Sequence, residues 1–104
     1  MKQYRHGDLF IKEIPNYPPN ARLVKAWVED NEVTLLRGEA TGHAHKLKGD
    51  FDLLRDKNNT MYFEVKTKAY LSHEEHKRID LPAGKYTVIR QREYTPKEIV
   101  YVRD

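Results

Sequence analysis

The sequence predicts an all-β fold, a small β-barrel or sandwich with few or no helices. Short apolar segments recur with turn signals every 8 to 12 residues or so, a spacing typical of those architectures. Several segments alternate apolar and polar residues, which is the period of a half-buried strand. The chain has 104 residues, the usual size of one domain, and no linker divides it. We therefore expect a single β domain over residues 1–104.

In the first half of the chain, we expect strands over residues 7–14, 21–28 and 33–37. The prolines of residues 15–20 end the first of these in a loop. Glu29-Asp30-Asn31 is a turn signal, so the second and third segments should pair as a hairpin. Gly38 and Gly42 indicate a bulge or bend before the first histidine pair.

In the second half, we expect strands over residues 51–54, 61–66, 69–71, 86–91 and 99–102. Asp56-Lys57-Asn58-Asn59 is the strongest turn signal, because Asn and Asp tolerate left-handed backbone and hydrogen-bond their own main chain. Pro82-Ala83-Gly84 predicts a further turn. The only helix candidates are single turns at residues 73–78 and 95–98.

Composition limits the classes of protein and of site. With 38% hydrophobic residues against 34% charged, the core is thin, which favours a homo-oligomer. The net charge of +3 permits contact with nucleic acid without requiring it. The absence of cysteine excludes disulfides, thiolate zinc sites and cysteine nucleophiles. We expect a cytoplasmic protein without membrane contact, because the sequence has no signal-peptide core and no stretch of about 20 apolar residues.

Four of the five histidines form two tight pairs, His43-Ala44-His45 and His73-Glu74-Glu75-His76. Imidazole is the commonest protein ligand for transition metals, so these four histidines are the predicted metal ligands. On a strand, positions 43 and 45 point to the same face. Positions 73 and 76 can share a site only if that segment leaves extended geometry. The predicted cofactor is a divalent transition metal, with Zn, Fe, Mn, Ni and Cu all compatible with such ligands.

Carboxylates near the histidines supply the other candidate groups. Glu39, Glu74 and Glu75 can complete a coordination shell or orient the imidazoles. With an open coordination position the metal can activate water, so Glu75, His73 and His76 are the candidate acid–base residues of an enzyme acting on a small or phosphorylated substrate. The pattern does not decide whether the protein is an enzyme. His6 is expected to be structural, with a contribution to the site as the alternative, and Gly7 after it indicates a turn or a close backbone approach.

Two alternatives use no metal. In one, paired histidines act as general base and general acid in RNA or phosphodiester cleavage, or the protein simply binds RNA. The groups that would hold phosphate or stack on a base are Lys46, Lys48, Arg78, Arg90, Arg92, Tyr86 and Tyr94, although the alternating pattern favours a core position for Tyr86. In the other, the chain is a structural or interaction module without an active site.

His43-Ala44-His45, following a glycine-containing turn in an all-β chain, resembles the first metal motif of the cupins. The resemblance covers roughly residues 38–90 and implies a double-stranded β-helix that holds a metal with the histidine pair, a following Glu and a later His. Only His43 and His45 carry over, since residues 46–50 contain no Glu. The whole chain also looks like a small bacterial or phage type of protein with paired histidines.

Overall fold

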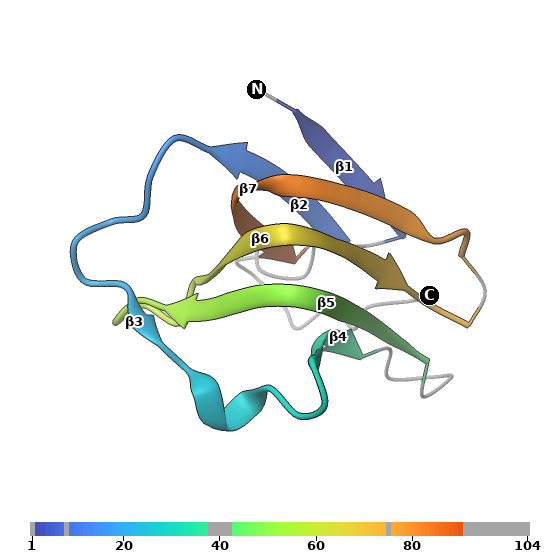
Figure 1. Cartoon of the computed structure of the whole chain (residues 1–104), viewed down its shortest axis with the longest axis horizontal. Coiled ribbons are helices and arrows are strands. Elements are labelled where there is room, and N and C mark those ends of the chain that lie inside the picture. Colours follow the sequence, from blue (N-terminus) through green and yellow to red (C-terminus); the bar gives the residue numbers. More distant parts are fainter. Residues whose placement is uncertain (1, 8, 38–42, 75, 91–104) are drawn as a thin grey trace, which may run out of the picture.

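The described strands all belong to one antiparallel sheet (Figure 1). The computed structural model describes residues 2–7, 9–37, 43–74 and 76–90. The strands are β1 (Gln3–His6), β2 (Leu9–Ile14), β3 (Arg22–Leu23), β4 (Glu32–Arg37), β5 (Ala44–Arg55), β6 (Met61–Ser72) and β7 (Ile79–Arg90). A 3₁₀ turn, η1 (Lys25–Trp27), is the only helical element in the described ranges. The predicted all-β class is confirmed.

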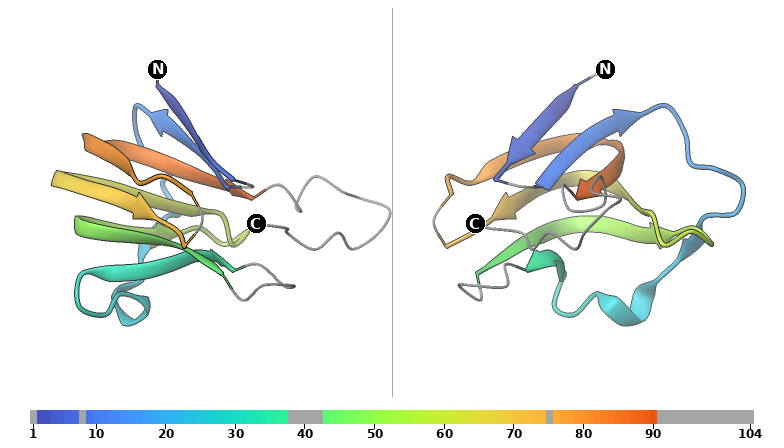
Figure 2. Two further views of the ribbon diagram at one scale, coloured as in Figure 1. Left: turned by 90° about the vertical axis from the view of Figure 1, so that its right-hand side faces the viewer. Right: turned by 180° about the vertical axis from the view of Figure 1, so that it is seen from behind.

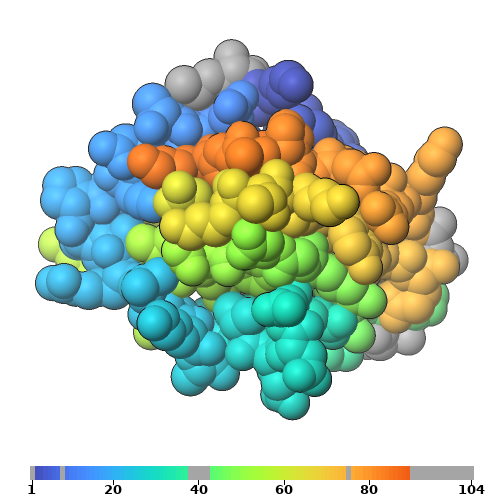
Figure 3. All heavy atoms as spheres, viewed as in Figure 1, coloured from blue at the N-terminus to red at the C-terminus, as the bar shows by residue number. Residues whose placement is uncertain are grey.

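The order along the sheet is β1-β2-β7-β6-β5-β3, and β4 also pairs with β5. In Figure 3, β7, β6 and β5 form adjacent orange, yellow and green bands across one face of the molecule. Between β1 and β4 no pairing is found among the described residues, so the sheet is not closed into a barrel.

The three longest strands, of 12 residues each, bend along a common line (Figures 1 and 2). The pairing of β5 with β6 shifts register between Gly49 and Phe51, and that of β6 with β7 shifts between Val65 and Lys68. At Gly49, a Cβ would lie 2.7 Å from the Cα of Ala69, so only glycine allows the two backbones to approach this closely. Bulges of this kind bend a strand and increase its twist.

The concave side of the bent sheet is filled by apolar side chains. Every second residue of β6 points inward at Met61, Phe63 and Val65, as the alternating pattern predicts. Phe63 stacks on Tyr86 with ring centroids 5.1 Å apart, and both side chains are almost fully buried. The core includes Leu9, Ile11, Val33, Leu35, Leu36, Leu47, Leu53, Ala69, Leu71, Leu81 and Val88.

Two local predictions are wrong. Residues 21–28 do not form a hairpin with residues 33–37: only Arg22–Leu23 are extended, and this strand and β4 both pair with β5. Pro82-Ala83-Gly84 is not a turn but lies inside β7, at the line where the sheet bends. Among the described residues, β2 pairs with β7 only from Lys85 onward, so Pro82 lies where one edge of β7 has no partner strand, a position that tolerates proline.

Other local predictions agree with the structure. Asp30, Asn31 and Asn59 have positive φ in the two predicted turns. The expected strands 51–54, 61–66 and 69–71 are parts of the longer β5 and β6. The predictions for Gly38, Gly42 and residues 95–102 fall outside the described residues. No helix in the described part of the chain is long and apolar enough to cross a membrane.

Candidate metal centre

The histidines meet at one end of the sheet, where β1 and β6 end and β5 begins. Although β2, β7 and β6 separate β1 from β5 in the sheet, the Nδ1 atoms of His6 and His45 lie only 2.9 Å apart. The curvature of the sheet therefore brings its first strand over the start of β5, and the histidine cluster fills the space between them.

Three histidines have the geometry of a metal site. One ring nitrogen from each of His45, His73 and His76 lies within 4.8 Å of the other two. Nitrogens about 2.0–2.1 Å from one zinc ion are at most about 4.2 Å apart, so small side-chain rotations suffice for all three to bind the same ion. These residues can hold a metal ion. His45 is fully buried and the other two are half-buried, so the site faces solvent on the side of the loop.

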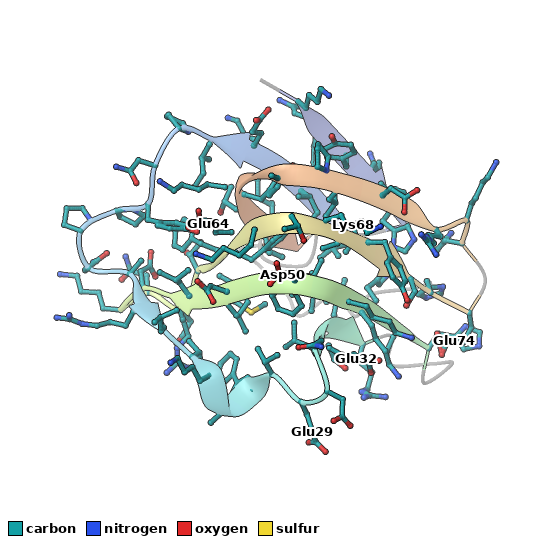
Figure 4. The ribbon with its side chains drawn as sticks, viewed as in Figure 1. Glu29, Glu32, Asp50, Glu64, Lys68 and Glu74 are labelled. Atoms are coloured by element: carbon teal, nitrogen blue, oxygen red, sulfur yellow. The ribbon has the colours of Figure 1, made fainter. Side chains whose placement is uncertain are left out.

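The loop between β6 and β7, residues 73–78, is tied to the sheet at two points. An oxygen of the Glu74 carboxylate accepts a hydrogen bond of 3.1 Å from the backbone N–H of Ala44, at the start of β5. Figure 4 shows Glu74 at this end of the sheet. Further on, the carbonyl of Lys77 lies 3.1 Å from Nε2 of His6. His73 and His76 are therefore positioned by contacts to two different strands.

The hydrogen bond from Ala44 also stabilises the charged form of Glu74. It lowers the pKa of the carboxyl group, and positive charge on His43 or His73 would lower it further. Glu74 is thus a carboxylate at neutral pH, and it holds the loop through a charge-assisted hydrogen bond.

His6 is 2% exposed and lies in the cluster without belonging to the three-histidine group. Burial lowers its pKa, and charge on His76 or His73 would lower it further; the hydrogen bond to the Lys77 carbonyl acts in the opposite direction. His6 is therefore a neutral imidazole, with one nitrogen that donates and one that accepts.

The backbone of Gly7 packs directly against the imidazoles of His45 and His76. Its φ of +64° joins β1 to β2 through a two-residue connection, a conformation that favours glycine. A Cβ at this position would lie 2.7 Å from Nε2 of His76 and 3.0 Å from Cε1 of His45. The absence of a side chain thus makes room for both imidazoles, as the predicted close backbone approach requires. Nε2 of His76 is buried and has no hydrogen-bond partner among the described residues.

The structure brings together part of the predicted site. His45 from the first pair meets both histidines of the second pair. His43 lies beside His73, with ring centroids 5.5 Å apart, but outside the three-histidine group, so its role as a ligand stays a prediction. Residues 73–78 leave extended geometry, as a shared site requires. Glu39 and Glu75 lie outside the described residues. The sequence favoured a structural role for His6 and left a contribution to the site open, with the following Gly7 as the only signal; the structure places His6 in contact with the cluster.

The chain matches the family described as "Domain of unknown function (DUF8820)" over residues 5–91. The chain belongs to this family. No match was found among the curated proteins or among the solved structures. The match spans every described strand from β2 to β7, and therefore the three-histidine group of this DUF8820 domain. The family description names no activity, and the resemblance to cupins stays a prediction.

Proposed function

We propose that this DUF8820 domain binds a divalent transition metal ion through His45, His73 and His76. The mutual approach of three ring nitrogens within 4.8 Å, on a strand and a loop about thirty residues apart, is the observation that carries the proposal. Neutral imidazole nitrogens suit zinc, copper, iron and nickel. The buried, unbonded Nε2 of His76 supports the same conclusion, since a buried polar nitrogen normally has a partner.

Three protein ligands leave a tetrahedral ion with one open position, as in catalytic rather than structural zinc sites. Because imidazoles carry no charge, the ion would keep its full charge and lower the pKa of a bound water to near 7 in favourable cases. The half-buried His73 and His76 leave that position accessible. The chemistry that fits is metal-assisted attack by water on a small substrate, with the neighbouring Glu75 as the predicted acid–base group.

The metal-free alternatives receive less support from the contacts. General acid–base cleavage needs imidazoles that reach a substrate, which limits it to the half-buried His43, His73 and His76, because His6 and His45 are buried. Lys46 and Lys48 both lie within ion-pair distance of Glu32, at 3.5 and 3.4 Å, which lowers their availability to phosphate. Tyr86 is in the core and cannot stack on a base. RNA cleavage and a purely structural role stay predictions.

The decisive experiment is elemental analysis by inductively coupled plasma mass spectrometry, on untagged protein purified without any chelator. We expect about one metal ion per chain. In His76→Ala the ion should be lost, because two imidazoles remain where three were available. His76 is the preferred position for substitution because it is in the loop and only half-buried, so the fold should tolerate alanine.

His43→Ala is the matched control, because it removes an imidazole next to the cluster but outside the three-histidine group. Retained metal in this variant assigns the ligands as proposed, whereas loss would add His43 to the ligand set. A folded wild-type protein that contains no metal, and takes up none from added zinc, would refute the proposed function.

A further inference from the structure

His6 connects two parts of the centre through its two ring nitrogens. Nε2 lies 3.1 Å from the carbonyl oxygen of Lys77, and Nδ1 lies 2.9 Å from Nδ1 of His45. Both separations are hydrogen-bond distances. The contacts form a continuous line from the backbone of the loop, through His6, to an imidazole of the three-histidine group.

The direction of each hydrogen bond follows from the first acceptor. A carbonyl oxygen only accepts, so Nε2 of His6 carries the proton. His6 is 2% exposed beside three other imidazoles, where a second proton would place an unpaired charge in a buried position. Nδ1 of His6 therefore bears a lone pair and accepts. Its partner, Nδ1 of His45, must then carry the proton of this hydrogen bond, so Nε2 is the nitrogen of His45 that can bind a metal ion.

We propose that His6 is a positioning residue that holds His45 as the Nδ1-protonated tautomer and so presents Nε2 of His45 to the metal. Only the last step rests on the proposed metal function, since the tautomers are properties of the metal-free protein. Histidine ligands commonly donate their second N–H to a fixed acceptor, which sets the orientation of the ring. Here the acceptor is another histidine, itself fixed by the backbone of the loop that carries His73 and His76.

The distances favour this role for His6 over direct coordination. Two nitrogens on one ion can also be about 2.9 Å apart, so the contact with His45 alone does not separate the two roles. However, a ligand must also approach the remaining two donors, and His6 is not part of the group whose nitrogens lie within 4.8 Å of one another. Its ring centroid is 6.1 Å from that of His73, whereas the centroids of His45 and His76 lie 4.3 and 4.4 Å from that of His73.

Long-range ¹H–¹⁵N NMR correlation on metal-free, ¹⁵N-histidine-labelled protein tests the tautomers directly. We expect pyrrole-type signals for Nε2 of His6 and Nδ1 of His45, and pyridine-type signals for the other two nitrogens. On titration with zinc, the Nε2 signal of His45 should move to the metal-bound range while both nitrogens of His6 keep their types. A His45 protonated at Nε2, or a metal-bound shift at Nδ1 of His6, would overturn the proposal.

Two substitutions separate positioning from coordination. In His6→Asn the amide oxygen can replace Nδ1 as an acceptor, yet it is a poor ligand for zinc, so zinc affinity should stay within a few-fold of wild type. In His6→Leu the acceptor is lost, and affinity should fall about 10–100-fold. Equal losses in both variants would contradict positioning, as would unchanged affinity in a folded His6→Leu protein. If wild type binds no zinc, the proposed function fails, whereas the metal-free spectrum still decides the tautomers.

Discussion

The close approach of Gly7 to the histidines makes Gly7→Ala a sharp test of the centre. The added methyl group would lie 2.7 Å from Nε2 of His76 and 3.0 Å from Cε1 of His45. Contacts this short are not tolerated, so the imidazole of His76 should be displaced from the metal position. Alanine must also adopt φ near +64°, in the left-handed region, which costs about 1–2 kcal/mol.

The two effects appear in different measurements. Without metal, the free energy of unfolding should fall by about 1–2 kcal/mol, which lowers Tm by about 4–16 °C in a domain of this size. In wild type, zinc at about 100 times its Kd should add about 2.7 kcal/mol and raise Tm by about 10–20 °C. In Gly7→Ala this increase should be absent, because the displaced His76 leaves only two imidazoles for the ion.

Differential scanning calorimetry of untagged protein, with and without zinc, measures both shifts. Gly84→Ala is the matched control: its φ is +156°, but the nearest atoms lie 3.5–3.7 Å from the added Cβ and belong to Tyr86 and Glu13, away from the histidines. This variant should keep the full response to zinc. A folded Gly7→Ala protein with the wild-type zinc response would refute the argument that the added methyl group displaces His76 from the metal position.

Three further predictions concern the loop and the core. Glu74→Ala should weaken zinc binding, measured by competition with a chromophoric chelator, whereas Glu74→Gln should largely retain it because the amide oxygen still accepts from Ala44. Phe63→Ala should lower the free energy of unfolding in urea by about 3–5 kcal/mol, since Phe63 is fully buried; a loss below about 1 kcal/mol would contradict the packing. Burial raises the pKa of Tyr86 to about 12, so the contribution of Tyr86 to stability should be constant below pH 10 and decline as pH rises towards 12. In urea unfolding across this pH range, Tyr86→Phe should show a smaller decline than wild type.

The strand content of this chain could be predicted, but the pairing could not. Alternation in residues 61–66 identified the inward face of β6 because burial there follows the period of the strand. The expected hairpin of residues 21–28 failed because periodicity contains no information about partners. Leu23 and Trp27 are 53% and 45% exposed, and Arg22 and Leu23 pair with Arg55 and Leu54, more than thirty residues away.

The misread turn at Pro82-Ala83-Gly84 has a different cause. The predicted turn would reverse the chain, whereas the strand continues through these residues and Gly84 alone has a positive φ. Proline and glycine occur both in turns and at bends of long strands, because proline lacks a backbone N–H and glycine adopts backbone conformations that other residues avoid. Only the register shift of the neighbouring strand, between Val65 and Lys68, distinguishes the two cases, and that shift is not visible in residues 82–84 themselves.

For the candidate site, the residue types could be predicted and their arrangement only in part. The paired spacing of His43 with His45 and of His73 with His76 identifies from the sequence alone the two segments that carry the candidate ligands. His6 could not be assigned, since a single histidine on a strand has no spacing pattern. Its place in the cluster depends on the curvature that carries β1 across three intervening strands to β5.

That curvature also suggests why the site lies where it does. A bent, open sheet must hold its first strand against β5 without a hydrogen-bonded ladder between them. Apolar packing of Leu9 and Leu47 fills the interior, while at this end of the sheet the contact is made by His6 and His45. An ion bound to His45, His73 and His76 would tie the start of β5 to the loop that His6 contacts. Binding and closure of the sheet would then be coupled, because the ligands are in place only when β1, β5 and the loop meet.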